Sequence, residues 1–244
     1  MKSRRARAGS DSEVVKTVTA GSVGIGGGLR RSSGLVEEVV ARIRQDIGSM
    51  KIEPGGRISV DNLAREFGVS QTPIREALSR LEALGLVTKR YLVGYCCAPK
   101  LTRDKFDKLY EVRLLLEPYV ARLAARNMSL ESLAELEVVL NDMEPARAGE
   151  SVASYQHFAD QDALFHAMIA TGSGNELAAD ALARLHTHMH IFRLRFHSEV
   201  TNEAFLEHKL LLDILRARSG SAAEGAMREH IQRSYERLVQ FTCD

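Results

Sequence analysis

The chain has 244 residues, of which 45% are hydrophobic and 27% charged, a balance typical of folded, water-soluble proteins. No apolar run approaches the roughly 20 residues that a membrane-spanning helix requires. The basic N-terminus is not followed by the apolar stretch of a secretion signal. These features argue against a membrane partner and predict a cytoplasmic protein. The three cysteines form neither a disulfide framework nor a CxxC motif, so buried or inert thiols are expected.

Charge is distributed unevenly along the chain. Residues 1–100 contain 17 basic and 10 acidic side chains, a net charge of +7, whereas the remaining residues have a net charge of −6. A basic front half indicates a part that binds a polyanion, joined to a part with another task. Residues 1–32 are rich in Gly, Ser and Arg and have no sustained periodicity, which predicts a disordered basic arm. This arm either contacts DNA phosphates nonspecifically or is merely solvated.

The first amphipathic helix is predicted to begin at Ser33 as its N-cap and to end before Pro54-Gly55-Gly56. Its apolar stripe follows three- and four-residue spacing. The stripe consists of Leu35, Val36, Val39, Val40, Ile43 and Ile47.

Two short helices about a tight turn are predicted next. Ser59 is expected to cap the first helix and Ser70 the second, with Gly68 in the turn and Pro73 in the first turn of the second helix. The second helix buries one apolar stripe. Its other face carries Gln71, Thr72, Arg75, Ser79 and Arg80. This pattern is typical of a helix-turn-helix whose second helix enters the major groove N-terminus first.

A β-hairpin is predicted to follow the two helices. Residues 86–91 alternate enough for a strand, residues 92–94 make a turn, and residues 95–98 form a short return strand. Lys89 and Arg90 then lie near the hairpin tip. Residues 33–98 are therefore predicted to form a winged helix-turn-helix.

From Thr102 onward the sequence predicts helix throughout, after a linker over residues 99–104. Residues 105–240 are expected to form an all-α antiparallel bundle of about six helices, so the fold class is mainly α. The expected helices cover residues 103–127, 130–143, 152–171, 176–197, 202–217 and 221–241. Their expected caps include Thr102, Ser129, Asn202 and Ser221.

Four side chains in this bundle have the types and spacing of metal ligands. Asp162 and His166 are four residues apart and share one helix face. His208 and His230 are placed symmetrically about the turn that joins the last two helices, which brings them to the same depth. One carboxylate and three imidazoles could then bind a transition metal. Spacing alone leaves open that the histidines occupy ordinary core or surface positions.

The segment PGGRISVDNLAREFGVSQTPIREALSRLEALGLVTKRYLVGY resembles the DNA-binding signature of the GntR family, and the resemblance extends over residues 35–98. It implies that Gln71, Thr72 and Arg75 contact the operator and that Gly94 lets the wing approach the minor groove. An arginine at this position forks onto guanine O6 and N7 or clamps a phosphate, and threonine binds a phosphate.

The sequence departs from the family at two DNA-facing positions. Gln71 stands where arginine is common, which shifts the expected preference toward adenine. Val93 precedes the wing glycine where the family often has arginine, leaving Arg90 or Tyr91 as substitute contacts. Arg65 is a further candidate for DNA contact, although for Arg65, as for Arg80, a solvated helix face is the alternative.

A second resemblance covers residues 105–235. YEVRLLLEPYVARLAA, DALFH, the Gly174-Asn175 turn, EHKLLLDIL and REHI are similar to the FCD ligand-binding domain. This resemblance implies a divalent metal, zinc or nickel, on Asp162, His166, His208 and His230, coordinated by a small carboxylate effector.

The same resemblance implies further residues of an effector pocket. Arg113 would pair with the effector carboxylate, and its alternative is a salt bridge to Glu117 one turn away. Asn175 and His190 are additional candidates. His190 shares a helix face with His186, so this pair could line the pocket, bind a second metal, or simply be solvated.

The combined prediction is a DNA-binding transcriptional regulator, a repressor rather than an enzyme, that binds double-stranded operator DNA as a homodimer. Two alternatives are a metal-responsive regulator without an organic effector and a metallohydrolase. The hydrolase is disfavoured because the chain has no HExxH motif and no evident glutamate base.

Overall fold

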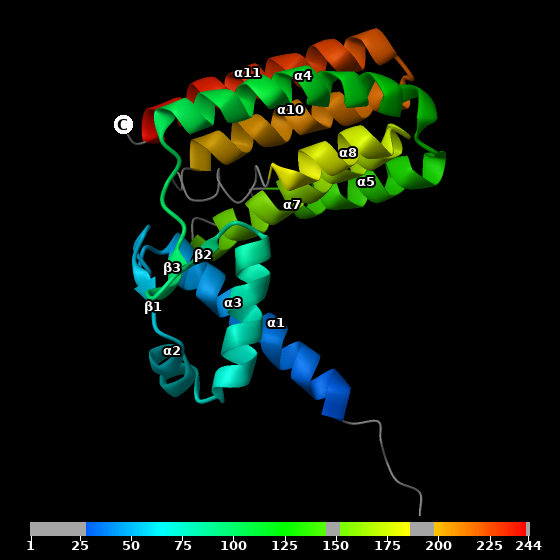
Figure 1. The fold of residues 1–244 in the computed structure, drawn as a ribbon. Coiled ribbons are helices and arrows are strands. Elements are labelled where there is room, and N and C mark those ends of the chain that lie inside the picture. Colours follow the sequence, from blue (N-terminus) through cyan, green and yellow to red (C-terminus); the bar gives the residue numbers. More distant parts are fainter. Residues whose placement is uncertain (1–27, 145–151, 186–197, 243–244) are drawn as a thin grey trace, which may run out of the picture.

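The computed structural model describes residues 28–144, 152–185 and 198–242. Figure 1 shows an N-terminal part, built from helices and a small sheet, below a C-terminal layer of long helices. The fold is mainly α, as predicted. Each part has its own hydrophobic core: one extends from Val36 to Cys97 and the other from Phe106 to Leu238.

The N-terminal part begins with helix α1 (Gly28–Gly48), whose stripe of Val36, Val39, Ile43 and Ile47 is buried. The helix starts before Ser33, so the prediction of Ser33 as its cap was wrong and residues 28–32 are helical rather than part of the arm. No proline interrupts these residues, so the helix can continue past the serine. Residues 1–27, the remainder of the predicted arm, lie outside the described residues.

The helix-turn-helix consists of α2 (Val60–Phe67) and α3 (Gln71–Ala83). Ser59 caps α2 as predicted, and Gly68 ends it in the left-handed conformation at φ 67°. Ser70 precedes α3 but makes no side-chain cap, which corrects the expectation. A capping serine usually accepts the N–H of the second or third helical residue, and the third residue here is Pro73, which has none.

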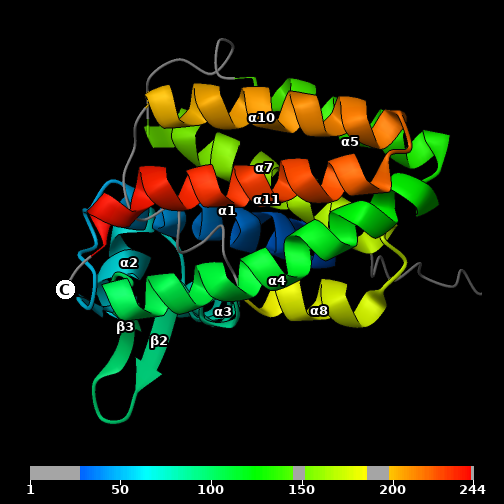
Figure 2. The same cartoon turned by 90° about the horizontal axis from the view of Figure 1, so that it is seen from above.

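The wing lies in a three-stranded antiparallel sheet of order β1-β3-β2. Its strands are β1 (Arg57–Ile58), β2 (Val87–Arg90) and β3 (Gly94–Cys97). The short β1 was not predicted, and it pairs Arg57 with Cys96. Viewed from above, the β2–β3 hairpin projects away from the rest of the molecule (Figure 2). Cys96 and Cys97 are buried in this sheet, as expected for structural thiols.

Six helices of the described residues build the C-terminal part. They are α4 (Arg103–Asn127), α5 (Leu130–Asp142), α7 (Val152–Gly172), α8 (Glu176–Arg184), α10 (Ser198–Arg216) and α11 (Gly220–Leu238), followed by the 3-10 turn η1 (Val239–Phe241). Helix α11 runs antiparallel to α4 along much of its length (Figures 1 and 2). Among the described helices, none is both long and apolar enough to cross a membrane.

The predicted ends of these helices are right in some places and wrong in others. Thr102 and Ser129 accept backbone N–H groups and cap α4 and α5 as predicted. Asn202 instead lies inside α10, and Ser221 lies inside α11, whose N-cap position is Ser219. Polar residues with good capping chemistry are tolerated within a helix whose packing favours its continuation. The expected extension of α8 to residue 197 lies outside the described residues.

The two parts meet where α1 lies against α7. Arg44 on α1 forms an ion pair with Asp160 on α7, and Arg44 is mostly buried there. The predicted linker is short, because Thr102 already caps α4. The N-terminal part and the C-terminal part are therefore in direct contact as well as joined by the chain.

Candidate functional site

The N-terminal end of α3 presents the predicted DNA contacts to solvent. Gln71, Thr72 and Arg75 are exposed, whereas Pro73 and Ile74 between them are buried. The Arg75 guanidinium donates to Gln71 Oε1 at 3.2 Å, and the Gln71 amide donates to Asp61 Oδ1 at 2.5 Å. These exposed side chains thus form a hydrogen-bonded chain that holds Arg75 at the front of the helix.

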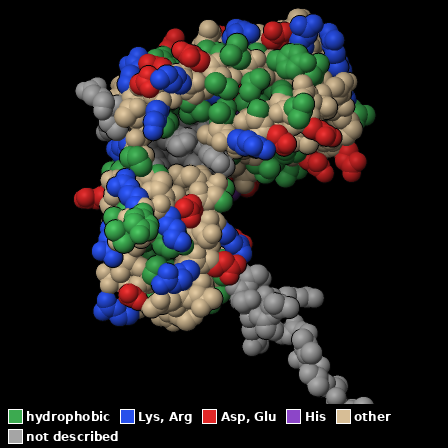
Figure 3. Space-filling view, in the orientation of Figure 1, with side chains coloured by type: hydrophobic (Ala, Val, Ile, Leu, Met, Phe, Trp, Pro, Cys, Tyr) green, Lys and Arg blue, Asp and Glu red, His purple; other side chains and the backbone are tan. Residues whose placement is uncertain are grey.

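Other predicted DNA contacts lie on neighbouring surfaces. Arg65 is exposed and donates to Asn62 Oδ1 at 2.6 Å. Arg80 instead forms ion pairs with Glu37 and Glu76, which fits the alternative of a surface role for that residue. Figure 3 shows Lys and Arg side chains spread over the displayed face of the N-terminal part. Positive charge is therefore available for phosphate contacts.

The wing tip carries Arg90 and Gly94 at its two ends, with Gly94 at φ 94°. Arg90 is exposed. Between them, Tyr91 and Leu92 are 90% and 89% exposed, and Leu92 adopts φ 62°. Because position 93 is valine rather than arginine, the outermost side chains of the wing are apolar or aromatic.

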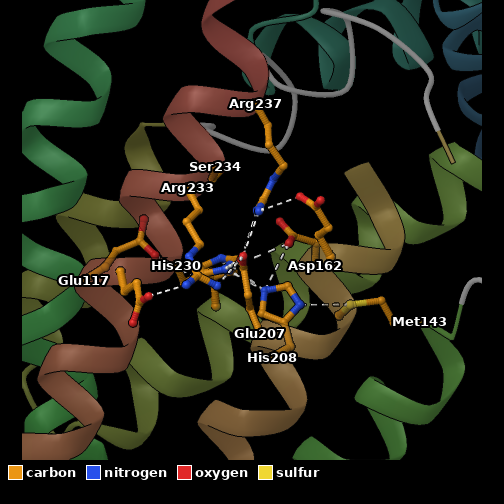
Figure 4. Close-up of polar contacts among 12 residues, drawn as sticks. Glu117, Met143, Asp162, Glu207, His208, His230, Arg233, Ser234 and Arg237 are labelled. Atoms are coloured by element: carbon orange, nitrogen blue, oxygen red, sulfur yellow. Dashed lines mark hydrogen bonds and ion pairs between the residues drawn. The ribbon is translucent and has the colours of Figure 1, made fainter. Parts of the chain in front are cut away.

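The four predicted metal ligands converge in the C-terminal part, and Figure 4 labels three of them, Asp162, His208 and His230. Asp162 and His166 come from α7, His208 from α10 and His230 from α11. The Nε2 atoms of the three histidines lie 3.2 to 3.3 Å from one another. Asp162 Oδ1 lies 3.4 Å from His208 Nε2, and one ligand atom from each residue fits within a 4.8 Å span.

The outer nitrogen of each histidine has its own partner. His230 Nδ1 lies 2.7 Å from Glu207 Oε2, and His166 Nδ1 lies 2.6 Å from Glu117 Oε2. His208 Nδ1 lies 3.3 Å from Met143 Sδ. Such partners fix the orientation of metal-binding imidazoles and leave the opposite nitrogen free to bind.

The spacing of the inner nitrogens can be compared with known metal geometry. Two imidazole nitrogens on a tetrahedral zinc ion, each about 2.0 to 2.1 Å from the metal, lie about 3.3 Å apart. The separations of 3.2 to 3.3 Å agree with this value. The donor set and its geometry therefore fit a divalent transition metal on these four residues.

Burial and nearby charges also set the protonation of the site. Burial, with the charges of the neighbouring histidines, lowers the pKa of His208 well below its usual value, and burial lowers the pKa of His230. Although burial opposes it, the positive charges of Arg113 and His166 hold the pKa of Glu117 below its usual range. Although burial opposes it, the negative charge of Glu117 raises the pKa of His166. Metal binding requires neutral imidazoles, so His208 and His230 are already in the required state, whereas His166 would have to lose a proton.

Arg113 lies beside this cluster and is 3% exposed. Its Nε donates to Glu117 Oε1 at 2.5 Å, so the salt bridge expected as the alternative is present. Its Nη1 is buried without a hydrogen-bond partner among the described residues. Arg113, Asp162 and His166 line one cavity of about 510 Å³. The same guanidinium can therefore pair with Glu117 and still offer a donor to a ligand.

The two remaining predicted pocket residues are placed differently. The Asn175 side chain accepts the N–H of Ala178 at 3.1 Å and caps α8, so its amide oxygen has a structural partner. His190, like His186, lies outside the described residues.

Sequence reasoning missed three partners of the candidate ligands: Glu207, Met143, and Glu117 in its contact with His166. The sequence position of two of them could have indicated these contacts. Glu117 is one turn from Arg113, and Glu207 directly precedes His208. Met143 follows a different helix and offered no such signal.

A winged helix-turn-helix joined to a helical domain is the architecture of a DNA-binding transcription regulator. The description "Bacterial regulatory proteins, gntR family" matches residues 35–95, and "FCD domain" matches residues 108–233. The chain belongs to the GntR family of transcriptional regulators and has an FCD domain at its C-terminal side.

Curated relatives agree with this assignment, and a solved structure shares the fold. The regulator LutR of Bacillus subtilis is 30% identical over 203 residues, which cover 74% of this chain and 90% of LutR. The galactonate operon transcriptional repressor of Escherichia coli is 27% identical over 84% of this chain and 97% of its own length. The structure of E. coli McbR has a TM-score of 0.64 at 23% identity and covers 84% of this chain and 97% of that one. The protein is thus a DNA-binding transcriptional regulator, and its relatives are regulators rather than enzymes.

Proposed function

We propose that the protein is a cytoplasmic repressor that leaves its operator when a small carboxylate binds at a divalent metal centre in the C-terminal part. The observation that carries this proposal is the Arg113 guanidinium. Its Nη1 is buried without a described partner, in the cavity that Asp162 and His166 also line. A buried donor without an acceptor is costly, and an anionic ligand would supply the acceptor.

The metal in this proposal is held by Asp162, His166, His208 and His230. If the metal takes a coordination number above four, it would supply an electrophilic centre with a position open to a carboxylate oxygen. Glu117 and Glu207 orient two of the imidazoles through their Nδ1 atoms. Arg113 orients the carboxylate through a charge-assisted hydrogen bond.

The DNA-binding half of the proposal assigns operator contacts to the exposed residues of α3 and the wing. Arg75 and Gln71 contact base edges, Thr72 binds a phosphate, and Arg65 and Arg90 approach the backbone, with Gly94 allowing close approach of the wing. A winged helix of this size reads one half-site. We propose that residues 105–240 dimerise and so present two such helices to a palindromic operator.

Two relatives that are repressors support the proposal that this protein represses transcription. The matched galactonate operon protein of E. coli and the gluconate operon protein of Bacillus licheniformis are transcriptional repressors.

The test measures acetate binding to zinc-loaded and metal-free protein by calorimetry, alongside operator affinity by fluorescence anisotropy. We expect acetate binding that requires zinc and that Arg113→Gln reduces at least tenfold. Arg122→Gln, on the exposed side of the same helix, is the matched control and should leave acetate binding unchanged. Operator binding that responds to zinc but to no carboxylate would favour the metal-responsive alternative and overturn the proposal.

A further inference from the structure

The cavity beside the metal-ligand cluster has a polar end and apolar walls. We infer that its ligand is a carboxylic acid with an apolar alkyl or aryl body, not a polyhydroxylated acid, and that this body contacts Leu84 of the DNA-binding part. The inference rests on the proposed function, because it takes the carboxylate to bind at Arg113 and the metal.

The polar end of the cavity is a single connected group. Arg113 pairs with Glu117, Glu117 with His166, and His166 with Asp162. All four line the cavity of about 510 Å³, a volume within the range of small-molecule sites. One end of the cavity therefore holds the charged groups and has room for one carboxylate.

The walls that α4, α7 and α8 supply are different in character. Val120 and Ala170 are buried there, with Ala179 and Leu182 packed against them as a small apolar cluster. These side chains carry no hydrogen-bonding group. Two further polar lining residues, Thr171 and Asp180, are exposed to solvent and lie at the rim.

A cavity with one charged end and apolar walls favours some carboxylic acids over others. A hydroxyl group buried against Val120, Ala170 or Leu182 would lose its water partners without gaining others. A methylene group at the same place gains the free energy of leaving water. An acid with an apolar body is therefore favoured on the side formed by these three helices.

The cavity also reaches the DNA-binding part. Leu84 lines it together with the residues of the C-terminal part, and Leu84 is the C-cap residue of α3. Helix α3 has 13 residues and spans about 20 Å, with Gln71 and Arg75 at the opposite end. A ligand body that presses on Leu84 thus acts on the helix that is proposed to read the operator.

A homologous series tests the ligand class on the zinc-loaded full chain. Acetate, butanoate, hexanoate and gluconate are titrated by calorimetry. We expect affinity to rise about fourfold with each added methylene, and gluconate to bind no more tightly than acetate. Gluconate binding more tightly than hexanoate, or equal affinity for acetate and hexanoate, would overturn the inference while leaving carboxylate binding intact. Failure of every acid to bind would count against the proposed function itself.

Two variants test the placement of the apolar body. Ala179→Leu fills part of the cavity and should lower hexanoate affinity at least tenfold with little change for acetate. Ala181→Leu, an exposed alanine on the same helix, is the matched control and should change neither. An unchanged hexanoate affinity in Ala179→Leu would show that the body does not lie along α8.

Leu84→Ala tests the contact with α3. Hexanoate should still bind within about fivefold, but the loss of operator affinity that hexanoate causes should shrink at least fivefold. Circular dichroism and operator binding without ligand establish that the variant is folded. A full response to hexanoate in a folded Leu84→Ala variant would contradict the contact.

Discussion

Arg75 is the residue on which sequence-specific DNA binding is expected to depend most. It is exposed and makes one hydrogen bond, to the side-chain oxygen of Gln71, so Arg75→Ala should leave the fold intact. Loss of a bidentate contact to guanine costs about 1 to 3 kcal/mol of discrimination. Fluorescence anisotropy should show weaker binding to the operator and little change for scrambled DNA.

The control for Arg75 is Arg228→Ala, a half-exposed arginine of α11, which should change neither measurement. If Arg75→Ala weakens operator and scrambled DNA equally, Arg75 clamps a phosphate instead of reading a base.

Glu117 is the buried residue whose negative charge is expected to contribute most to the stability of the site. It pairs with both Arg113 and His166, and its side chain is 6% exposed. Glu117→Gln keeps the shape but leaves the Arg113 charge buried without its counterion, and breaking such a pair costs about 3 to 5 kcal/mol. Urea unfolding of metal-free protein should show a loss of this order.

The comparison for Glu117 is Glu224→Gln, which alters an ion pair at the surface and should cost less than about 1 kcal/mol. A similar small loss in Glu117→Gln would mean that Arg113 finds another partner in the folded protein.

Predictability at the residue scale depended on whether a partner lies nearby in the chain. The four candidate metal ligands could be named from their types, spacing and family resemblance. Ser59 was a correct cap, because its partner, the N–H of Asn62, is three residues away. The Met143 contact to His208 joins residues 65 apart, and no local pattern encodes it.

Among the elements, the β2–β3 hairpin offers the clearest test of DNA docking. Arg90 is exposed near its tip, and each phosphate contact releases counterions, so losing one lowers the salt slope of binding by about one. Arg90→Ala should therefore weaken operator binding more at low salt than at high salt. Anisotropy titrations at several salt concentrations measure the slope.

The wing test needs a basic residue far from DNA as its reference. Lys209 is exposed on α10, and Lys209→Ala should leave the salt slope unchanged. An unchanged slope in Arg90→Ala as well would mean that the wing does not contact the phosphate backbone.

The sequence predicted which segments are helical, but it did not predict where several of these helices begin. The apolar periodicity of α4 fixed its position, and Thr102 marked its start. In α1 and α10 the helix begins before the residue with the best capping chemistry. Capping contributes only about 1 kcal/mol, so packing of the preceding turn can override it.

At the scale of the whole molecule, the ligand cluster joins three helices that are distant in sequence. Free zinc at 100 times its dissociation constant should raise the free energy of unfolding by about 2.7 kcal/mol. A chelator should remove this stabilisation. Thermal unfolding of His208→Ala should show no response to zinc. His157→Ala, an exposed histidine of α7, should respond like the unaltered protein, and a zinc response that persists in His208→Ala would contradict the site.

The two-part architecture was predictable from the sequence, whereas the contact between the parts was not. The helix-turn-helix and the bundle each follow from local periodicity and turn residues. The Arg44–Asp160 ion pair joins residues 116 apart, and the position of Leu84 at the cavity depends on how α3 meets the helical part. Such placements are set by tertiary packing, which residue spacing does not specify.

The pairing of α4 with α11 has a consequence for synthesis of the protein. The N-terminal core is complete by Cys97, whereas the C-terminal core needs α11, which ends at Leu238. At 5 to 20 residues per second, the ribosome takes about 7 to 30 s to cover that interval. A nascent chain therefore displays a finished DNA-binding fold well before its last imidazole ligand, His230, has been made. During that time the proposed metal site is still incomplete.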